Sequence, residues 1–309
     1  MRWVNDNKSR CHMNKLLKKA LCLSFFLLTI CCSSNNSEEI VNDEPRLNQS
    51  DSLALVSIYQ EIGPWLQEWN LNDITTWNGV QTALNLETNE IRVIGFEVYN
   101  GNFRGTFPEE FCQLTELRRL VLGGGQMGGS IPNNIGKLKN LIYLCVAGNN
   151  VGGYIPESIG ELTKLQELQL MDNQICGSIP ESIGNLVNLE YLYICRTLVS
   201  GELPKSLANL NKLQIADLHK NRLSGVFPIE ILKDSVFIEC EDNNITELPF
   251  EVWNDSLTCI PPVLKRNRLS GLIPEWVKET KKWNKYASIC ISLQQKNYGY
   301  SNYSHKEEN

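Results

Sequence analysis

The chain has 309 residues, of which 42% are hydrophobic and 21% are charged, which is typical of a folded protein with ample apolar material for a core. Its formal net charge of −6 argues against nucleic-acid binding, which usually needs a basic surface, so we expect no nucleic-acid partner. Only three histidines are present, so we also expect no metal site, no cofactor and no histidine-based catalytic relay.

The beginning of the chain has the order of features found in export signals. Three lysines precede an apolar run over residues 20–30, which is too short to span a membrane comfortably. Residues 1–31 are therefore predicted to be a signal, with Met13 as an alternative start. The polar residues that follow, 32–50, are predicted to be a tether.

Two cysteines close the apolar run, and this arrangement resembles the end of a bacterial lipoprotein signal. The resemblance implies a lipidated cysteine and a membrane-anchored protein at the outer membrane or cell surface. Cys32 is preferred because the small Cys31 precedes it, although Thr29 lies at its −3 position. Cys31 remains the alternative, with the bulky Ile30 before it. An ordinary secretory signal with incidental cysteines also stays open.

Residues 51–92 are predicted to form an N-terminal cap. Asp51 and Ser52 can cap a helix whose apolar residues keep helical spacing until Gly63 and Pro64 end it. A tryptophan-rich segment and a turn follow. We expect this segment to cover the apolar end of the repeats that come after it.

A 24-residue frame recurs through the middle of the chain. Residues 141–164 and 165–188 are near-copies with the frame L-x-x-L-x-L/V-x-x-N-x-hydrophobic-x-G-x-I-P-x-x-I-G-x-L-x-x. A fixed period of this length indicates a solenoid, in which each unit buries its apolar face against its neighbours. Eight units are predicted within residues 93–276, the last two degenerate. They start at Val93, Leu117, Leu141, Leu165, Leu189, Leu213, Ser235 and Cys259.

The frame resembles the 24-residue class of leucine-rich repeat, which is familiar from plant receptor ectodomains and also occurs in bacterial surface proteins. The resemblance implies an α/β-type right-handed horseshoe with a parallel β-sheet on its concave face. Proline at position 16 cannot donate to a ladder, so the convex side is predicted to be irregular or 3-10 helical. Residues 277–309 are predicted to be a C-terminal cap and tail.

Position 9 of the frame is asparagine in five units. A buried asparagine there is expected to hydrogen-bond backbone groups of the turn between neighbouring units. The five are Asn149, Asn173, Asn221, Asn243 and Asn267, and Thr197 is one of the exceptions.

Eleven cysteines are scattered over different positions of the frame. Cys145 and Cys195 lie two units apart, roughly 10 Å at the usual strand spacing, which is too far for a disulfide. Most of the cysteines are therefore interpreted as unpaired small hydrophobic residues. Cys240 and Cys259 are the one pair left open.

Side chains at positions 3, 5, 7 and 8 are predicted to point away from the core on the concave face. In the central units these positions combine aromatic and charged residues, which is how interfaces are usually composed. The candidate ligand-binding residues are Tyr143, Glu167, Gln169, Met171, Tyr191, Tyr193, Arg196 and Asp217. The alternative is that these side chains face only solvent and that tyrosine occurs there because it is favoured in β-strands.

Asp217 and His219 share a strand face and resemble an acid–base pair, but the sequence places no nucleophile or second carboxylate beside them. We interpret them as a surface pair and predict that the chain is not an enzyme. The predicted function is recognition of a protein or peptide ligand. Binding of a polysaccharide, with the tyrosines stacked on sugar rings, and a structural or adhesive spacer are the alternatives.

Overall fold

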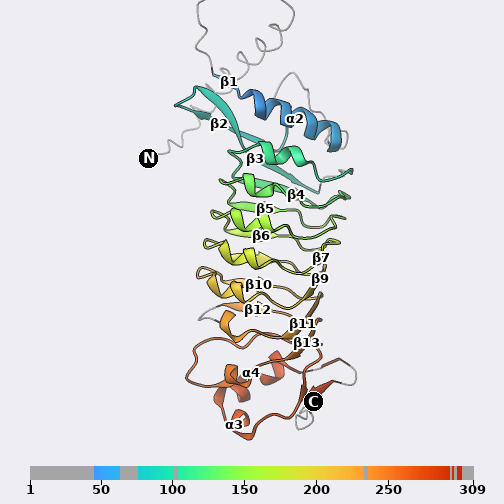
Figure 1. Ribbon diagram of the computed structural model, residues 1–309, viewed down its shortest axis with the longest axis vertical. Helices are drawn as coiled ribbons and strands as arrows, with labels where there is room; N and C mark the ends of the chain where they lie inside the picture. Colours follow the sequence, from blue (N-terminus) through green and yellow to red (C-terminus); the bar gives the residue numbers. More distant parts are fainter. Residues whose placement is uncertain are drawn as a thin grey trace, which may run out of the picture.

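The computed structural model describes residues 45–62, 76–100, 104–232, 236–292, 294–295 and 298–300. These form an elongated stack of repeats with the first helix at one end and the last two helices at the other (Figure 1). The predicted signal, with Met13, Cys31 and Cys32, lies outside the described residues, and so do residues 32–44 of the predicted tether. Its last residues, 45–50, contain β1 and the start of α2, so the folded part begins earlier than predicted.

The larger sheet takes one strand from each of the first seven predicted repeats, and the eighth contributes only an isolated bridge between Glu239 and Val263. Within the described residues its strands follow the order β1-β3-β4-β5-β6-β8-β10-β12, all parallel. The hairpin strand β2 pairs antiparallel with β3. The bounds are β1 Arg46–Leu47, β2 Val80–Asn85, β3 Glu90–Tyr99, β4 Arg119–Gly123, β5 Tyr143–Cys145, β6 Glu167–Gln169, β8 Tyr191–Tyr193, β10 Ile215–Asp217 and β12 Phe237–Glu239. This architecture confirms the predicted leucine-rich-repeat fold class.

The strand register agrees with the predicted alignment of the repeats. Tyr143 lies opposite Glu167, and Glu167 lies opposite Tyr191, so residues 24 apart are neighbours. The shorter step is also present, because Ile215 lies opposite Phe237.

The side opposite the large sheet holds short 3-10 helices, as predicted. Their bounds are η4 Glu109–Gln113, η5 Ile135–Lys137, η6 Glu157–Glu161, η7 Glu181–Asn185, η8 Lys205–Asn209, η9 Ile229–Ile231 and η10 Phe250–Trp253. A proline directly precedes η6, η7 and η8, where the missing N–H costs nothing because a helix start has no acceptor for it.

A second parallel sheet was not predicted. It has the order β13-β11-β9-β7, with bounds β7 Cys176–Gly177, β9 Leu198–Gly201, β11 Arg222–Val226 and β13 Asn244–Glu247. In Figure 1 these strands run along the edge of the stack away from the large sheet. Each is too short to show the alternation of a strand in the sequence. Gly177, Gly201 and Gly225 end or interrupt them with φ of 75°, 82° and 79°, a backbone region that favours glycine.

A ladder of buried asparagines joins successive repeats, and this confirms the predicted role of position 9. The amide of Asn173 donates to the carbonyl of Val146 in the preceding repeat at 2.9 Å, and its Oδ1 accepts the N–H of Val151 at 3.0 Å. Asn173 is 4% exposed. The asparagine thus satisfies polar backbone groups that the tight turns leave inside the stack.

The N-terminal helix α2 spans Gln49–Ile62, and its predicted stop at Gly63 and Pro64 lies outside the described residues. Its start differs, because Asn48 provides the cap by accepting the N–H of Asp51 at 3.2 Å. Asp51 is instead fully buried and binds Arg92 and the N–H of Val93 in β3. The carboxylate was predicted to be a local cap but holds the helix to the first repeat.

The C-terminal end contains the helices α3 Glu275–Lys278 and α4 Lys281–Cys290 and the strand pair β14 Ser270–Gly271 and β15 Gly299–Tyr300. Trp283 of α4 packs edge-on against Trp253, with ring centroids 4.9 Å apart. Among the described helices, none has the length and hydropathy needed to cross a membrane.

The cysteines in the described part of the chain are free thiols, and these include Cys240 and Cys259. The pairing that the sequence left open is therefore not formed in this structure. Cys240 is fully buried and acts as a small apolar side chain in the core.

Candidate functional site

The register of the large sheet brings the predicted site residues onto one face as two adjacent rows. Position 3 aligns Tyr143, Glu167 and Tyr191 on successive strands. Position 5 aligns Gln169, Tyr193 and Asp217 in the same way. These side chains are half-buried, whereas the residues between them along each strand, such as Leu168 and Leu192, are fully buried. The strand alternation thus separates core from surface as predicted.

Tyr191 and Tyr193 are the aromatic centre of this face. Their rings are parallel within 1°, with centroids 6.5 Å apart, because they lie two residues apart on one strand. The hydroxyl of Tyr191 donates to Oε1 of Gln214 at 3.1 Å. Burial raises the pKa of Tyr193, and the charge of Glu167 adds to this effect, so its hydroxyl remains a donor at neutral pH.

Tyr143 belongs to a cluster at the N-terminal side of the face. The guanidinium carbon of Arg119 lies 4.3 Å from the centroid of its ring, which is a cation–π arrangement. Arg119 also binds the carboxylate of Glu97, with Nε 2.8 Å from Oε1. Burial raises the pKa of Tyr143 above its usual range. The ring is therefore held in place by the face itself.

The remaining central residues carry polar groups between the tyrosines. The amide of Gln169 donates to Oε1 of Glu167 at 2.6 Å, so this carboxylate already has a partner within its own strand. Met171 is half-buried beside them at position 7. The face thus presents a mixed surface of rings, an amide and a carboxylate.

Arg196 lies on a turn rather than on a strand, which corrects its predicted place. Position 8 adopts a left-handed backbone in several repeats, with φ of 53° at Arg196 and 56° at Asp172. Both Nε and Nη2 of Arg196 donate to the carboxylate of Asp172, each at 2.6 Å. This pair lowers the pKa of Asp172. The charge of Arg196 is therefore at the rim of the face and is largely compensated.

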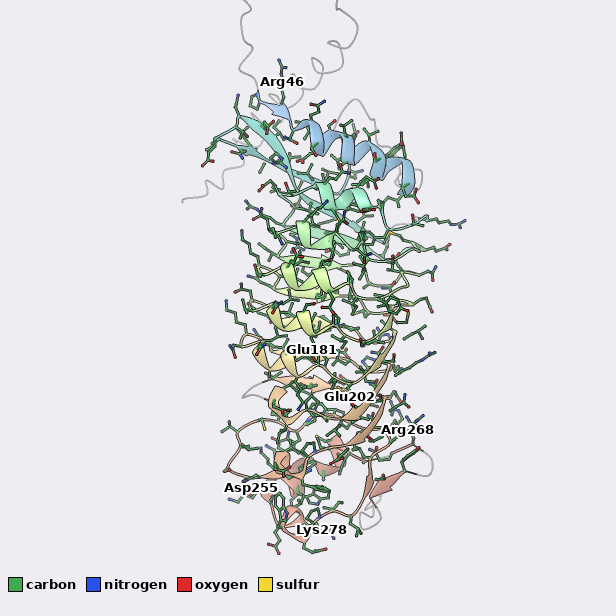
Figure 2. The ribbon with its side chains drawn as sticks, viewed as in Figure 1. Arg46, Glu181, Glu202, Asp255, Arg268 and Lys278 are labelled. Carbon is green, nitrogen blue, oxygen red and sulfur yellow. The ribbon has the colours of Figure 1, made fainter. Side chains whose placement is uncertain are left out.

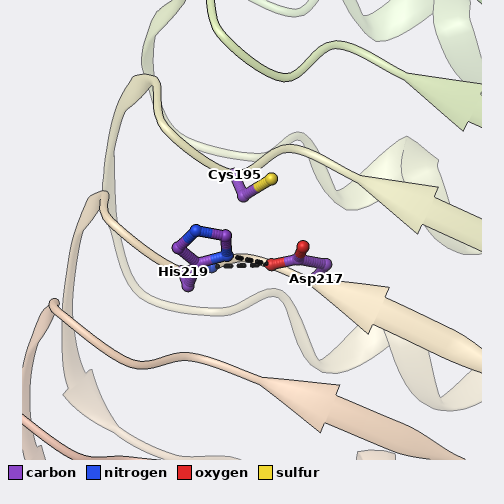
Figure 3. Close-up of side chains that lie close together, drawn as sticks. All are labelled: Cys195, Asp217 and His219. Atoms are coloured by element: carbon purple, nitrogen blue, oxygen red, sulfur yellow. Dashed lines mark hydrogen bonds and ion pairs between the residues drawn. The ribbon is translucent and has the colours of Figure 1, made fainter.

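Asp217 and His219 form the pair that their spacing predicts, and the structure adds a thiol to it. His219 Nδ1 lies 2.6 Å from Asp217 Oδ1. The buried Cys195 lies on the neighbouring repeat, and one donor atom from each of the three side chains falls within 4.8 Å of the others (Figure 3). Burial and the charge of Asp217 raise the pKa of the Cys195 thiol to about 12. A thiol with this pKa is a poor nucleophile at neutral pH.

The structure also shows surface residues that the sequence-based list omits. Phe237, opposite Ile215, is 41% exposed and extends the position-3 row beyond Tyr191. Arg119 extends it on the other side. The repeat frame places both Phe237 and Arg119 at position 3, so that alignment was the signal that could have found them.

A separate groove of about 750 Å³ lies on the other side of the stack, where the second sheet joins the 3-10 helices. Its rim is mostly acidic, with Glu157, Glu181, Glu202 and Glu230 beside Lys205. Figure 2 labels Glu181 and Glu202 on neighbouring repeats. Glu230 binds Lys205 at 3.4 Å, and Glu181 accepts the N–H of Ser206 at 3.3 Å. Part of this acidity is thus used within the scaffold.

Comparisons with known proteins agree with this architecture. The Leucine Rich Repeat family profile matches residues 164–186. No curated protein matches the sequence significantly.

Several solved structures resemble the chain. The ectodomain of the receptor kinase SOBIR1 from Arabidopsis thaliana is 28% identical, covers 58% of this chain and 97% of its own, and has a TM-score of 0.52. A plant ice-binding protein is 21% identical, with a TM-score of 0.55. The match covers 76% of this chain and 84% of the ice-binding protein. The plant peptide hormone receptor RGFR1, in complex with RGF2, is 28% identical with a TM-score of 0.46. The match covers 58% of this chain and 33% of the receptor chain, so this chain spans one third of that receptor. The chain has the fold of a leucine-rich-repeat solenoid.

Proposed function

We propose that the concave face binds a protein or peptide ligand and that the chain acts by recognition rather than catalysis. The observation that carries this proposal is the parallel pair of Tyr191 and Tyr193 at the centre of the large sheet. Tyrosine supplies a large contact area at low entropy cost, since its ring is rigid, and it is enriched among residues that dominate binding energy.

The surroundings of the pair also have the composition of a binding surface. Tyr143 lies two strands away, and the exposed Phe237 continues the same row on the other side. Charged groups border the row, with Arg119 beside Tyr143 and Asp217 beside Tyr193. An apolar centre with a charged rim fits a ligand that inserts a hydrophobic side chain and orients itself by polar contacts.

The type of chemistry available on this face favours binding over catalysis. The Cys195 thiol, which lies within 4.8 Å of the nearest ligand atom of His219, stays protonated at neutral pH because burial and the charge of Asp217 raise its pKa to about 12. Asp217 is bound to His219 and to the backbone N–H of the same residue. These contacts fix the surface for recognition.

We further propose that the chain is exported and anchored by lipid at Cys32 or Cys31, with residues 32–44 as a tether. The cap before the repeats then comprises residues 45–92, since Arg46 and Leu47 already form β1 and α2 begins at Gln49. The basis for export and anchoring is the order of charge, apolar run and cysteine in residues 15–32. SOBIR1 was solved as the ectodomain of a receptor kinase, which agrees with an exported location. A tether of this length would hold the repeats clear of the membrane.

Polysaccharide binding is the second candidate, and the parallel rings favour it specifically. Aromatic side chains that share one orientation can stack on successive sugar rings of an extended chain. The acidic carboxylates beside them can accept hydrogen bonds from sugar hydroxyls. A structural or adhesive spacer is the remaining alternative, in which the tyrosine face contacts only solvent.

Two binding experiments separate these candidates. Full-length protein is used to capture ligands from a proteome, and the same preparation is applied to a glycan array. A protein ligand that is captured by the wild type and lost by Tyr191→Ala and Tyr193→Ala supports the proposal. Glycan binding with the same dependence supports the second candidate. If the tyrosine variants keep both the protein signal and the glycan signal of the wild type, the tyrosine face is not the binding surface. The spacer then remains as the role of the repeats.

A further inference from the structure

The large sheet gathers three metal-ligating groups beside the tyrosine pair. Cys195 and His219 occupy position 7 of neighbouring repeats, and Asp217, the last residue of β10, lies two residues before His219. Adjacent parallel strands lie about 4.8 Å apart, so the repeat itself brings these side chains together. Figure 3 shows the thiol, the carboxylate and the imidazole on two successive rungs of the stack.

We propose that Cys195, Asp217 and His219 form a binding site for a divalent transition-metal ion of the Zn²⁺ type. The sequence led us to expect no metal, because the trio is assembled only by the stacking of two repeats. Thiolate, imidazole and carboxylate are the three ligand classes that Zn²⁺ uses in proteins. The proposal does not depend on ligand binding at the tyrosines.

The donor atoms have a spacing that a metal ion can use. They lie within 4.8 Å of one another, and His219 Nδ1 and Asp217 Oδ1 are already 2.6 Å apart. Metal–ligand bonds of about 2.0–2.3 Å place tetrahedral ligand atoms roughly 3.2–3.7 Å apart. Small side-chain rotations therefore suffice to bring the thiol closer and to open the imidazole–carboxylate pair.

Protons now occupy the places that a metal ion would take. The protonated Cys195 thiol lies within 4.8 Å of the ligand atoms of Asp217 and His219, and the imidazole shares a short hydrogen bond with the same carboxylate. A cation at the centre replaces these contacts, because it favours the thiolate and the Nδ1 lone pair as ligands. The thiol loses its proton to solvent, and the imidazole keeps one proton on Nε2. The burial that makes the thiol a poor nucleophile then protects the metal–sulfur bond from water.

The neighbouring strand supplies a fourth candidate ligand. Glu239 lies directly opposite Asp217 in the register. Its carboxyl is half-buried on the strand next to that of Asp217. A cation between Asp217 and Glu239 relieves the repulsion of two carboxylates on adjacent strands. Zinc sites with three protein ligands otherwise complete their shell with water.

Arg196 should weaken metal binding through His219 Nδ1, so its removal tests the proposed coordination geometry. Its Nη1 lies 3.4 Å from His219 Nε2. Nε2 can accept from Arg196 only while Nδ1 carries the proton. If a metal ion binds Nδ1, the imidazole proton moves to Nε2. The N–H groups of Nε2 and of Arg196 Nη1 are then both donors and repel each other. Removing Arg196 should strengthen metal binding.

The experiment uses the full chain with Co²⁺ as a spectroscopic probe and Zn²⁺ as a competitor. The wild type should develop a thiolate-to-cobalt charge-transfer band that Zn²⁺ abolishes. Cys195→Ser should lack this charge-transfer band, and His219→Gln should bind Co²⁺ at least tenfold more weakly than the wild type. Cys145→Ser is the matched control, since Cys145 is another buried thiol of the same sheet face. It should retain the band.

Arg196→Asn preserves a residue type that tolerates the left-handed backbone and should bind Co²⁺ severalfold more tightly. Melting temperatures measured without metal identify any variant that fails to fold, and Cys195→Ala then replaces Cys195→Ser. Identical Co²⁺ spectra for the wild type and both Cys195 variants would overturn the site. Weaker binding by Arg196→Asn than by the wild type would also contradict the proposed coordination.

Discussion

Asp51 of the first helix and Arg92 of β3 form a bidentate ion pair across the junction between the cap and the repeats. Nε and Nη2 of Arg92 lie 2.9 Å and 3.0 Å from the two carboxylate oxygens. The N–H of Val93 also donates to Asp51, at 2.8 Å. The carboxylate is fully buried and the arginine is 17% exposed.

Asp51→Ala should therefore destabilise the protein by about 3 kcal/mol, because it leaves a partly buried guanidinium and a buried N–H without their partner. Chemical denaturation measures this change. Asp172→Ala removes the partner of the exposed Arg196 and should cost about 0.5 kcal/mol. Equal losses in the two variants would mean that the helix is not fastened through Asp51.

The repeat frame predicted most of the fold because its period determines which residues are neighbours. Positions of Tyr143, Glu167 and Tyr191 followed from that period alone, and the sheet register agrees. The second sheet was missed because its two- to five-residue strands carry no pattern of their own. The role of Asp51 was also missed, since Arg92 lies 41 residues away in the sequence. Contacts between repeats and caps are not periodic, so the frame does not predict them.

The candidate site was predicted only in part, for a related physical reason. The frame tells which side chains leave the core, but not how they contact one another. The cation–π contact between Arg119 and Tyr143 depends on side-chain rotamers. The approach of Cys195 to Asp217 depends on them as well.

The asparagine ladder gives a second stability prediction. Asn173→Ala should cost about 1–3 kcal/mol, since the Val146 carbonyl and the Val151 N–H both lose a buried partner. Thermal unfolding measures this loss directly.

Thr197→Asn is the matched variant and should cost much less. Thr197 occupies the same position and now donates to Oδ1 of Asn221 at 2.6 Å. Asparagine there restores the repeat frame and leaves Asn221 Oδ1 free to accept a backbone N–H. Asn243 Oδ1 accepts the N–H of Leu223 in this way. Equal shifts in melting temperature for the two variants would contradict the ladder.

The lipid anchor is tested by replacing Cys31 and Cys32 together with serine. Two or three acyl chains hold a protein on a membrane, at about 0.8 kcal/mol for each buried CH₂, so their loss should release the chain. Fractionation shows whether the variant leaves the membrane, and mass spectrometry shows the acyl modification on the wild type. A variant that stays membrane-bound, with an unmodified wild type, would rule out the anchor.

Acid should weaken the contacts of the exposed turn residues. Arg196 lowers the pKa of Asp172, and Arg266 lowers that of Asp242. A lowered pKa in the folded state contributes stability above the ordinary carboxyl pKa of about 3.9, and that contribution is lost as pH falls through the folded value. Arg196→Asn should therefore flatten the dependence of melting temperature on pH below about 4. An unchanged slope would show that the pair does not form in solution.

Binding at the concave face is tested most directly by the affinity of the captured ligand for single tyrosine variants. Tyr191→Ala or Tyr193→Ala should weaken binding by about 2 kcal/mol or more while the melting temperature stays nearly unchanged, because both rings lie outside the core. Tyr154→Ala is the control, since Tyr154 is 69% exposed and belongs to the opposite side of the stack. It should bind like the wild type. Normal binding by both concave-face variants, with binding lost through changes in residues 51–80 or in the tail, would contradict recognition by this face.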